Sequence, residues 1–181
     1  MNENYKQYID MDLSDSPKGV LNIIYEGTDL PSISAISRNP TVSKKIQMAI
    51  ARSKVISGKI GLFRNKNIDI EAAVKVFETI HLSDLIIKKL KASSELQCRI
   101  ANNPNYLLRK RFAKHFKIKE EVQTILLDDE HYSVRVALVN NRFVTQPIRQ
   151  ALLKDNSSSV KGAILKSAFF TQEEKKSLCF W

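Results

Sequence analysis

The chain repeats itself with a period of 26 residues, and this periodicity limits the possible folds more than any other property of the sequence. Three segments align without gaps at that offset: Leu108–Gln123, Val134–Arg149 and Val160–Lys175. Each opens with an apolar residue followed by a cation, and a second apolar residue lies four positions after the first. These second positions are Phe112, Leu138 and Ile164. A fixed period of this length indicates an array of stacked units, because one such unit cannot bury its own hydrophobic face.

The repeat continues toward the N-terminus. Segments Ser34–Asn39 and Ile60–Asn65 are also 26 residues apart. Joining them to the later copies requires one two-residue deletion, after which a copy near Asp84–Leu90 fits. We therefore expect about six units from residue 30 to residue 181, preceded by an acidic segment, residues 1–29, that is partly ordered or caps the array.

Each unit is predicted to contain two short helices. Val134, Ala137 and Leu138 share one helical face, a second apolar helix begins near Ile148, and residues 140–144 between them are typical of a turn. Helices of this length are marginal alone and must be held by their neighbours. The predicted fold is all-α: a right-handed α-solenoid of about six two-helix repeats of roughly 26 residues.

Residues typical of helix starts support this division. Residues 171–174 and 94–97 match the capping-box pattern, with Thr171 and Ser94 as the expected caps. Asp69 and Ser43 are further candidate N-caps, and Pro147 falls where a first helical turn tolerates proline.

Part of the pattern resembles a known family. Residues 38–40 (Arg-Asn-Pro), 100–104 (Ile-Ala-Asn-Asn-Pro) and 134–141 (Val-Arg-Val-Ala-Leu-Val-Asn-Asn) resemble the leucine-rich repeat variant, a short relative of HEAT-like repeats. The resemblance covers roughly residues 30–178. It implies a curved right-handed superhelix with a binding surface and no particular chemistry. Founding members carry a cysteine-rich iron–sulfur segment before the repeats, but this chain has no cysteine before Cys98, so we expect no cofactor.

The charge of the chain is unevenly distributed. Its formal net charge is +10, yet residues 1–30 hold two basic and six acidic residues, whereas the remainder holds 27 basic and 13 acidic residues. Residues 30–68 and 96–119 contain no carboxylate but eight and seven Lys or Arg residues, respectively. Such asymmetry indicates an acidic partner, with nucleic acid, either DNA or RNA, as the first hypothesis.

Cations recur at equivalent positions of the repeat. Arg135 and Lys161 can pair with the preceding acids Asp129 and Asp155, which would tie adjacent units together, and for Arg135 we expect this pairing. Other cations have no acid close in sequence, and for them partner binding and an ordinary solvated face remain alternatives. The residues predicted to bind nucleic acid or another polyanion are Arg38, Arg64, Arg109, Lys110, Arg111, Lys114, Lys117 and Arg142.

Aromatic residues lie among these cations. Phe63 and Phe112 fall near the predicted core positions, whereas Tyr106 and Phe116 could either pack or stack on unpaired bases.

The sequence predicts no catalytic, metal or cofactor site. Two cysteines and three dispersed histidines match no metal-ligand spacing, and no phosphate-binding loop or nucleophile motif occurs. The prediction is a non-enzymatic binding module for nucleic acid or another polyanion. The main alternative is an adaptor that grips an acidic protein. A third is a HEAT-like DNA glycosylase, which would need a carboxylate and aromatic residues in a basic cleft.

The ends of the chain carry two further predictions. The N-terminus lacks a secretory signal and no apolar stretch is long enough for a membrane span, so we expect a cytoplasmic protein with no membrane contact. The apolar pair Phe180–Trp181 is a candidate contact with a partner or second copy, or folds back onto the last unit.

Overall fold

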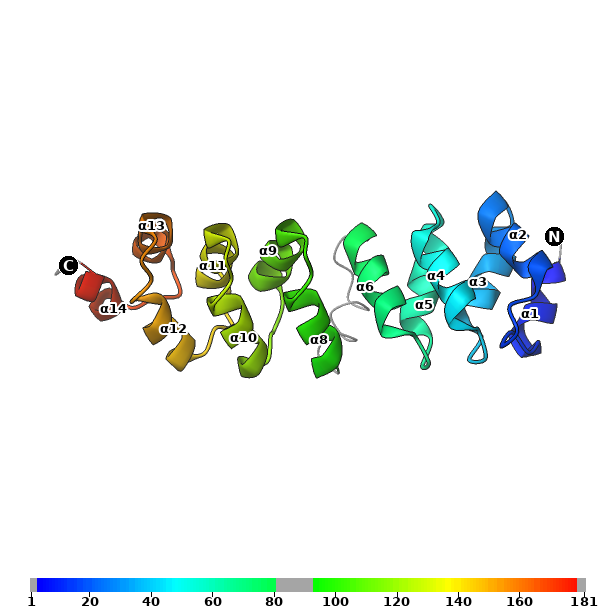
Figure 1. Cartoon of the computed structure of the whole chain (residues 1–181), viewed down its shortest axis with the longest axis horizontal. Helices are drawn as coiled ribbons and strands as arrows, with labels where there is room; N and C mark the ends of the chain where they lie inside the picture. The colour runs from blue at the N-terminus through cyan, green and yellow to red at the C-terminus, as the bar shows by residue number, and fades with distance from the viewer. Residues whose placement is uncertain (1–2, 81–92, 179–181) are drawn as a thin grey trace. The chain divides into compact units, whose positions relative to one another are not determined.

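Every secondary-structure element in the described part of the chain is a helix (Figure 1). The computed structural model describes residues 3–80 and 93–178, and the predicted all-α class is confirmed there. The copy predicted near Asp84–Leu90 and the Phe180–Trp181 pair lie outside the described residues. The chain divides into two compact units, residues 1–89 and 90–181.

The first unit contains paired short helices. They are η1 (Glu3–Lys6), α1 (Gln7–Asp10), α2 (Lys18–Glu26), α3 (Leu30–Arg38), α4 (Lys44–Arg52), α5 (Ile56–Arg64) and α6 (Ile70–Thr79). Helix α3 packs on α5 and on η1 and α1, while α4 packs on α2 and α6. The helices within residues 3–26 thus pack on α3 and α4. The boundary at residue 29, between an acidic N-terminal segment and the repeats, stays a prediction.

The second unit has two layers of helices. They are α8 (Ser94–Ala101), α9 (Tyr106–His115), α10 (Glu120–Leu127), α11 (Tyr132–Val139), α12 (Gln146–Leu152), α13 (Ser158–Lys166) and α14 (Gln172–Ser177). Helix α11 packs between α9 and α13, and α10 packs between α8 and α12 (Figure 1). We call α9, α11 and α13 the A layer of this unit, and α8, α10, α12 and α14 the B layer.

The helix starts follow the predicted capping chemistry with one shift. The Thr171–Glu174 capping box is confirmed, as are Asp69 and Ser43 as N-caps and Pro147 in the first turn of α12. The N-cap of α8 is Ser93 and not the predicted Ser94, so the helix begins one residue earlier than expected. The side chain of Ser93 accepts the N–H of Leu96. A serine at either position satisfies a free N–H of the first turn, so the sequence pattern cannot choose between them.

The predicted apolar positions form the core. Phe112, Leu138 and Ile164 are fully buried, and so are Ile36 and Leu62 at the equivalent positions of the first unit. Burying side chains of this size stabilises a fold by roughly 1.5–3 kcal/mol each. The repeat period therefore predicts which side chains fill the core of each unit.

Buried asparagines, which the sequence analysis did not single out, tie each loop to the one before it. The Nδ2 of Asn141 donates to the carbonyl oxygens of Ala113 and Phe116 at 2.7 and 2.8 Å, and its Oδ1 accepts the N–H of Phe143. Asn65 and Asn39, 26 residues apart, make the same kind of contacts in the first unit. The signal available in the sequence was asparagine recurring at the repeat period.

Buried glutamines reach in the opposite direction. The Nε2 of Gln123 donates to the carbonyl oxygens of Ile118 and Phe143, and its Oε1 accepts the N–H of Thr145 at 3.0 Å. Gln47 repeats this arrangement in the first unit. Side-chain amides therefore join each loop both to the preceding loop and to the following one. They supply hydrogen bonds to backbone groups of these loops.

We expect Asn141→Ala to lower the free energy of unfolding of the second unit by about 2–4 kcal/mol, because it removes three hydrogen bonds to the backbone, two of them to the buried carbonyl oxygens of Ala113 and Phe116. Urea unfolding combined with amide hydrogen exchange measures this loss. The matched control is Asn140→Ala, since Asn140 is exposed and bonds only within its own turn. A loss at Asn141 no larger than at Asn140 would contradict the bridging role.

Candidate functional site

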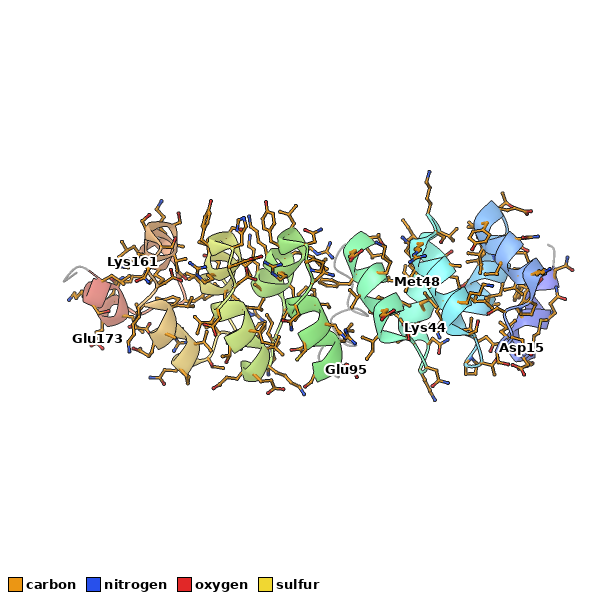
Figure 2. The ribbon with its side chains drawn as sticks, viewed as in Figure 1. Asp15, Lys44, Met48, Glu95, Lys161 and Glu173 are labelled. Carbon is orange, nitrogen blue, oxygen red and sulfur yellow. The ribbon has the colours of Figure 1, made fainter. Side chains whose placement is uncertain are left out.

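Charge is segregated between the two layers of the second unit. The A layer carries seven Lys or Arg residues, four in α9, one in α11 and two in α13, and no Asp or Glu. The B layer carries four Lys or Arg residues and five Glu residues. Figure 2 shows Lys161 on α13, with Glu95 and Glu173 on helices of the other layer. One layer thus concentrates positive charge without internal carboxylates to neutralise it.

Lys110 and Lys114 occupy one exposed stripe of α9. Residues four apart lie nearly above one another on a helix, one turn or about 5.4 Å apart. Tyr106 continues the same stripe toward the start of α9, and Lys117 is exposed just after the helix ends. The structure therefore brings together the exposed cations predicted in this segment.

Arg109 does not belong to this exposed set, which corrects the expectation that it lacked an acidic partner. Its side chain is 8% exposed. Its Nε donates to Oδ2 of Asp129 at 2.6 Å, its Nη2 donates to Oδ1 at 2.9 Å, and its Nη1 donates to the carbonyl oxygen of Asn103. The hydrogen bonds to Asp129 raise the pKa of Arg109 above its ordinary value. Arg109 is committed to joining two repeats.

Arg135 also pairs between repeats, but with a different acid from the one expected. Its Nε donates to Oδ2 of Asp155 at 2.6 Å, whereas Asp129 contributes only its backbone carbonyl oxygen. The predicted pairing of Arg135 with the Asp129 carboxylate is therefore wrong. The arginine reaches forward by 20 residues because its partner lies at the start of the next repeat.

Lys59 takes the equivalent position in the first unit. It is buried, and its Nζ donates to Oγ1 of Thr79 at 2.9 Å, again 20 residues ahead. Burial lowers the pKa of Lys59, and the positive charge of Lys75 adds to that effect. At this position of the repeat, Lys59 therefore bonds to the hydroxyl of Thr79, whereas Arg109 bonds to the carboxylate of Asp129.

The remaining predicted residues are spread over both units. Arg38 and Arg64 are exposed at the last positions of α3 and α5. Arg38 shares a cavity of about 600 Å³ with Asp10. Arg111 is half-buried in α9, and Arg142 is exposed in the loop after α11, 4.7 Å above the ring of Phe143. Each unit therefore has its own subset of these cations.

Aromatic rings form a stack at the start of the A-layer helices. The rings of Tyr106 and His131 are 3.9 Å apart and nearly parallel, and the ring of Tyr132 follows 5.3 Å beyond His131. Tyr106 and Tyr132 are 38% and 50% exposed. Phe116, the other residue left open, is buried, and Phe63 and Phe112 are in the core as predicted.

The first unit contains an apolar groove of about 1110 Å³. It is lined by parts of α2, α3, α4 and α5, and three cations, Lys45, Arg52 and Lys54, stand against a single acid, Glu26. Three of its lining side chains, Tyr25, Leu30 and Ile56, are large hydrophobic residues that are exposed. We refer to it as the α2–α4 groove.

A smaller cavity of about 360 Å³ in the second unit bears on the glycosylase hypothesis. It contains Asp129 and Asp155, but each carboxylate is held by an arginine. No aromatic side chain lines it among the described residues. The cavity thus does not combine a free buried carboxylate with an aromatic wall.

Comparison with known proteins returned no relative: no family model, no curated protein and no solved structure matches the chain.

None of the described helices combines the length and apolarity needed to cross a membrane. Within residues 3–80 and 93–178, no cluster of three or more His, Cys, Asp or Glu residues suits a metal ion. Cys98 is half-buried.

Proposed function

We propose that this protein is a cytoplasmic, non-enzymatic binding module, and that the A layer of its second unit binds nucleic acid through the phosphate backbone. The proposed architecture is a right-handed α-solenoid of repeats similar to the leucine-rich repeat variant. The observation that carries the proposal is the separation of charge, seven cations without a carboxylate in α9, α11 and α13.

Phosphate contacts suit this arrangement. Two of the seven cations, Arg109 and Arg135, are neutralised by buried aspartates. Lys110, Lys114 and Lys166 are exposed, and Lys166 in α13 lies at the helix position equivalent to Lys114 in α9. Adjacent packed helices are about 8–10 Å apart. Helix α11 lies between α9 and α13, so the exposed cations of these two helices can contact phosphates that are separated along one strand.

The test is fluorescence anisotropy with labelled duplex DNA, single-stranded DNA and RNA across a salt series. Binding should weaken with a log–log slope of several units, because each phosphate contact releases a condensed counterion. Absence of binding to every probe at 50 mM salt would refute the proposal.

The α2–α4 groove favours a second candidate function, docking of an acidic segment of another protein. Its apolar floor matches the side chains of Leu or Phe, and Lys45, Arg52 and Lys54 complement carboxylates beside them. Such charge complementarity directs encounter and selects the partner.

A displayed library of 12-residue peptides tests this candidate. We expect selected peptides to be acidic with at least one large apolar residue, and to bind Lys45→Glu/Arg52→Glu at least tenfold more weakly. The control exchanges the same charges at Lys66 and Lys18, which are exposed and outside the groove lining. Selection of neutral peptides, or equal loss in the control, would exclude the groove as the site.

A further inference from the structure

The aromatic stack of the second unit ends at Tyr132, which contacts the ring of His131 and is 50% exposed. Tyr106 and Tyr132 are 26 residues apart and begin α9 and α11. On Tyr106 the imidazole of His131, the N-cap of the next A-layer helix, lies 3.9 Å away with an interplanar angle of 4°. The residue equivalent to His131 in the following repeat is Ser157, the N-cap of α13. In the repeat that follows Tyr106 this N-cap position holds the imidazole of His131, whereas in the repeat that follows Tyr132 it holds a serine, which has no ring.

Two further positions on α13 also hold small residues. Ser158 replaces tyrosine at the start of the helix, and Gly162 replaces Lys110 one turn on. A Cβ added at Gly162 would meet nothing within 4 Å. Beyond it Lys166 is exposed at the end of α13. Helix α13 thus carries small residues at its start and at Gly162, and an exposed cation, Lys166, one turn after Gly162.

We infer that the exposed side chain of Tyr132 takes an unpaired nucleobase, so that the second unit binds single-stranded nucleic acid in preference to duplex. The inference rests on the proposed function, which supplies the phosphate contacts. The imidazole on Tyr106 shows the geometry a base would adopt, because both are flat heteroaromatic rings that stack on a tyrosine face. Bases inside a duplex are already stacked on both faces, so a duplex cannot offer one to Tyr132 without unpairing.

One charge beside the stack opposes binding. Glu130 precedes His131 and its side chain is 88% exposed, while it approaches Nη2 of Arg109 at 3.5 Å. Its repulsion of a nearby phosphate should reduce affinity. Glu130→Gln is therefore expected to strengthen binding of both single strands and duplexes about two- to threefold, because this effect is electrostatic and requires no base.

The decisive variants either remove the ring or cover it. Tyr132→Leu should weaken binding of a labelled 12-nucleotide oligo(dT) about tenfold, the size expected for one lost stacking contact, and duplex binding less than twofold. Ser157→His should have the same selective effect, because it recreates over Tyr132 the imidazole that His131 places over Tyr106. Tyr25→Leu, which removes an exposed tyrosine from the first unit, is the matched control.

A 12-residue abasic oligonucleotide separates stacking from phosphate binding. It should bind the wild-type protein as weakly as oligo(dT) binds Tyr132→Leu, and should show no difference between the two proteins. If all probes bind with a salt dependence but neither the abasic probe nor the variants reduce affinity, the stacking inference fails and the proposed function stands. If no probe binds at 50 mM salt, both fail.

Discussion

Replacing Asp129 by alanine is expected to lower the free energy of unfolding of the second unit by about 3–5 kcal/mol, the usual cost of removing one partner from a buried ion pair. The carboxylate accepts two hydrogen bonds from Arg109, and it also accepts the N–H of His131 at the start of α11. Both charged side chains are less than 10% exposed. Without Asp129 the guanidinium of Arg109 stays buried and charged, and the carboxylate that remains near it, Glu130, is exposed and more distant.

Urea unfolding, monitored by amide exchange within residues 93–178, measures this loss. Glu130→Ala is the control, since Glu130 neighbours Asp129 but is almost fully exposed, and exposed pairs contribute about 0–1 kcal/mol. The double variant Arg109→Met/Asp129→Ala should be more stable than Asp129→Ala, because it removes the unpaired charge. Equal losses in Asp129→Ala and Glu130→Ala would refute the buried tie between repeats.

Reversing three exposed A-layer charges, Lys110→Glu/Lys114→Glu/Lys166→Glu, is expected to weaken nucleic-acid binding by at least about a hundredfold at 150 mM salt. Each lost phosphate contact should also reduce the salt slope by roughly 0.7–0.9. Fluorescence anisotropy across a salt series measures both quantities. Circular dichroism verifies that the variant keeps its helices.

The matched control reverses three exposed cations outside α9, α11 and α13: Arg99, Lys154 and Lys176. It changes the net charge by the same amount, so non-specific attraction alone would weaken binding equally in the two triple variants. We expect the control to lose less than tenfold. Equal loss in both would mean that total charge, and not the A layer, determines binding.

Sequence periodicity was sufficient for the helices and the core. The spacing of Phe112, Leu138 and Ile164 identified fully buried positions, and Asp69, Ser43 and Thr171 were correctly assigned as caps. These features depend on the helical repeat of 3.6 residues and on hydrogen bonds within one turn. Both are local properties, and a linear pattern records them.

The candidate site was only partly accessible from the sequence. Arg109 and Lys110 are adjacent and equally cationic, yet one is buried against Asp129 and the other is exposed. The repeat offset indicated that they face different directions but not which of them meets an acid. For the same reason the sequence assigned Arg135 to Asp129, when its partner is Asp155.

By itself, the sequence determined the helical class, the 26-residue period, the apolar core and the excess of positive charge. Tertiary structure alone decided which cations are free, which polar side chains join the loops, and that the rings of Tyr106, His131 and Tyr132 stack. The physical reason is that apolar burial depends on which face of a helix a residue occupies, which the local repeat fixes. The partner of a polar or aromatic side chain depends on which atoms the next repeat brings within about 3–5 Å, and only the packing of one repeat on the next sets those distances.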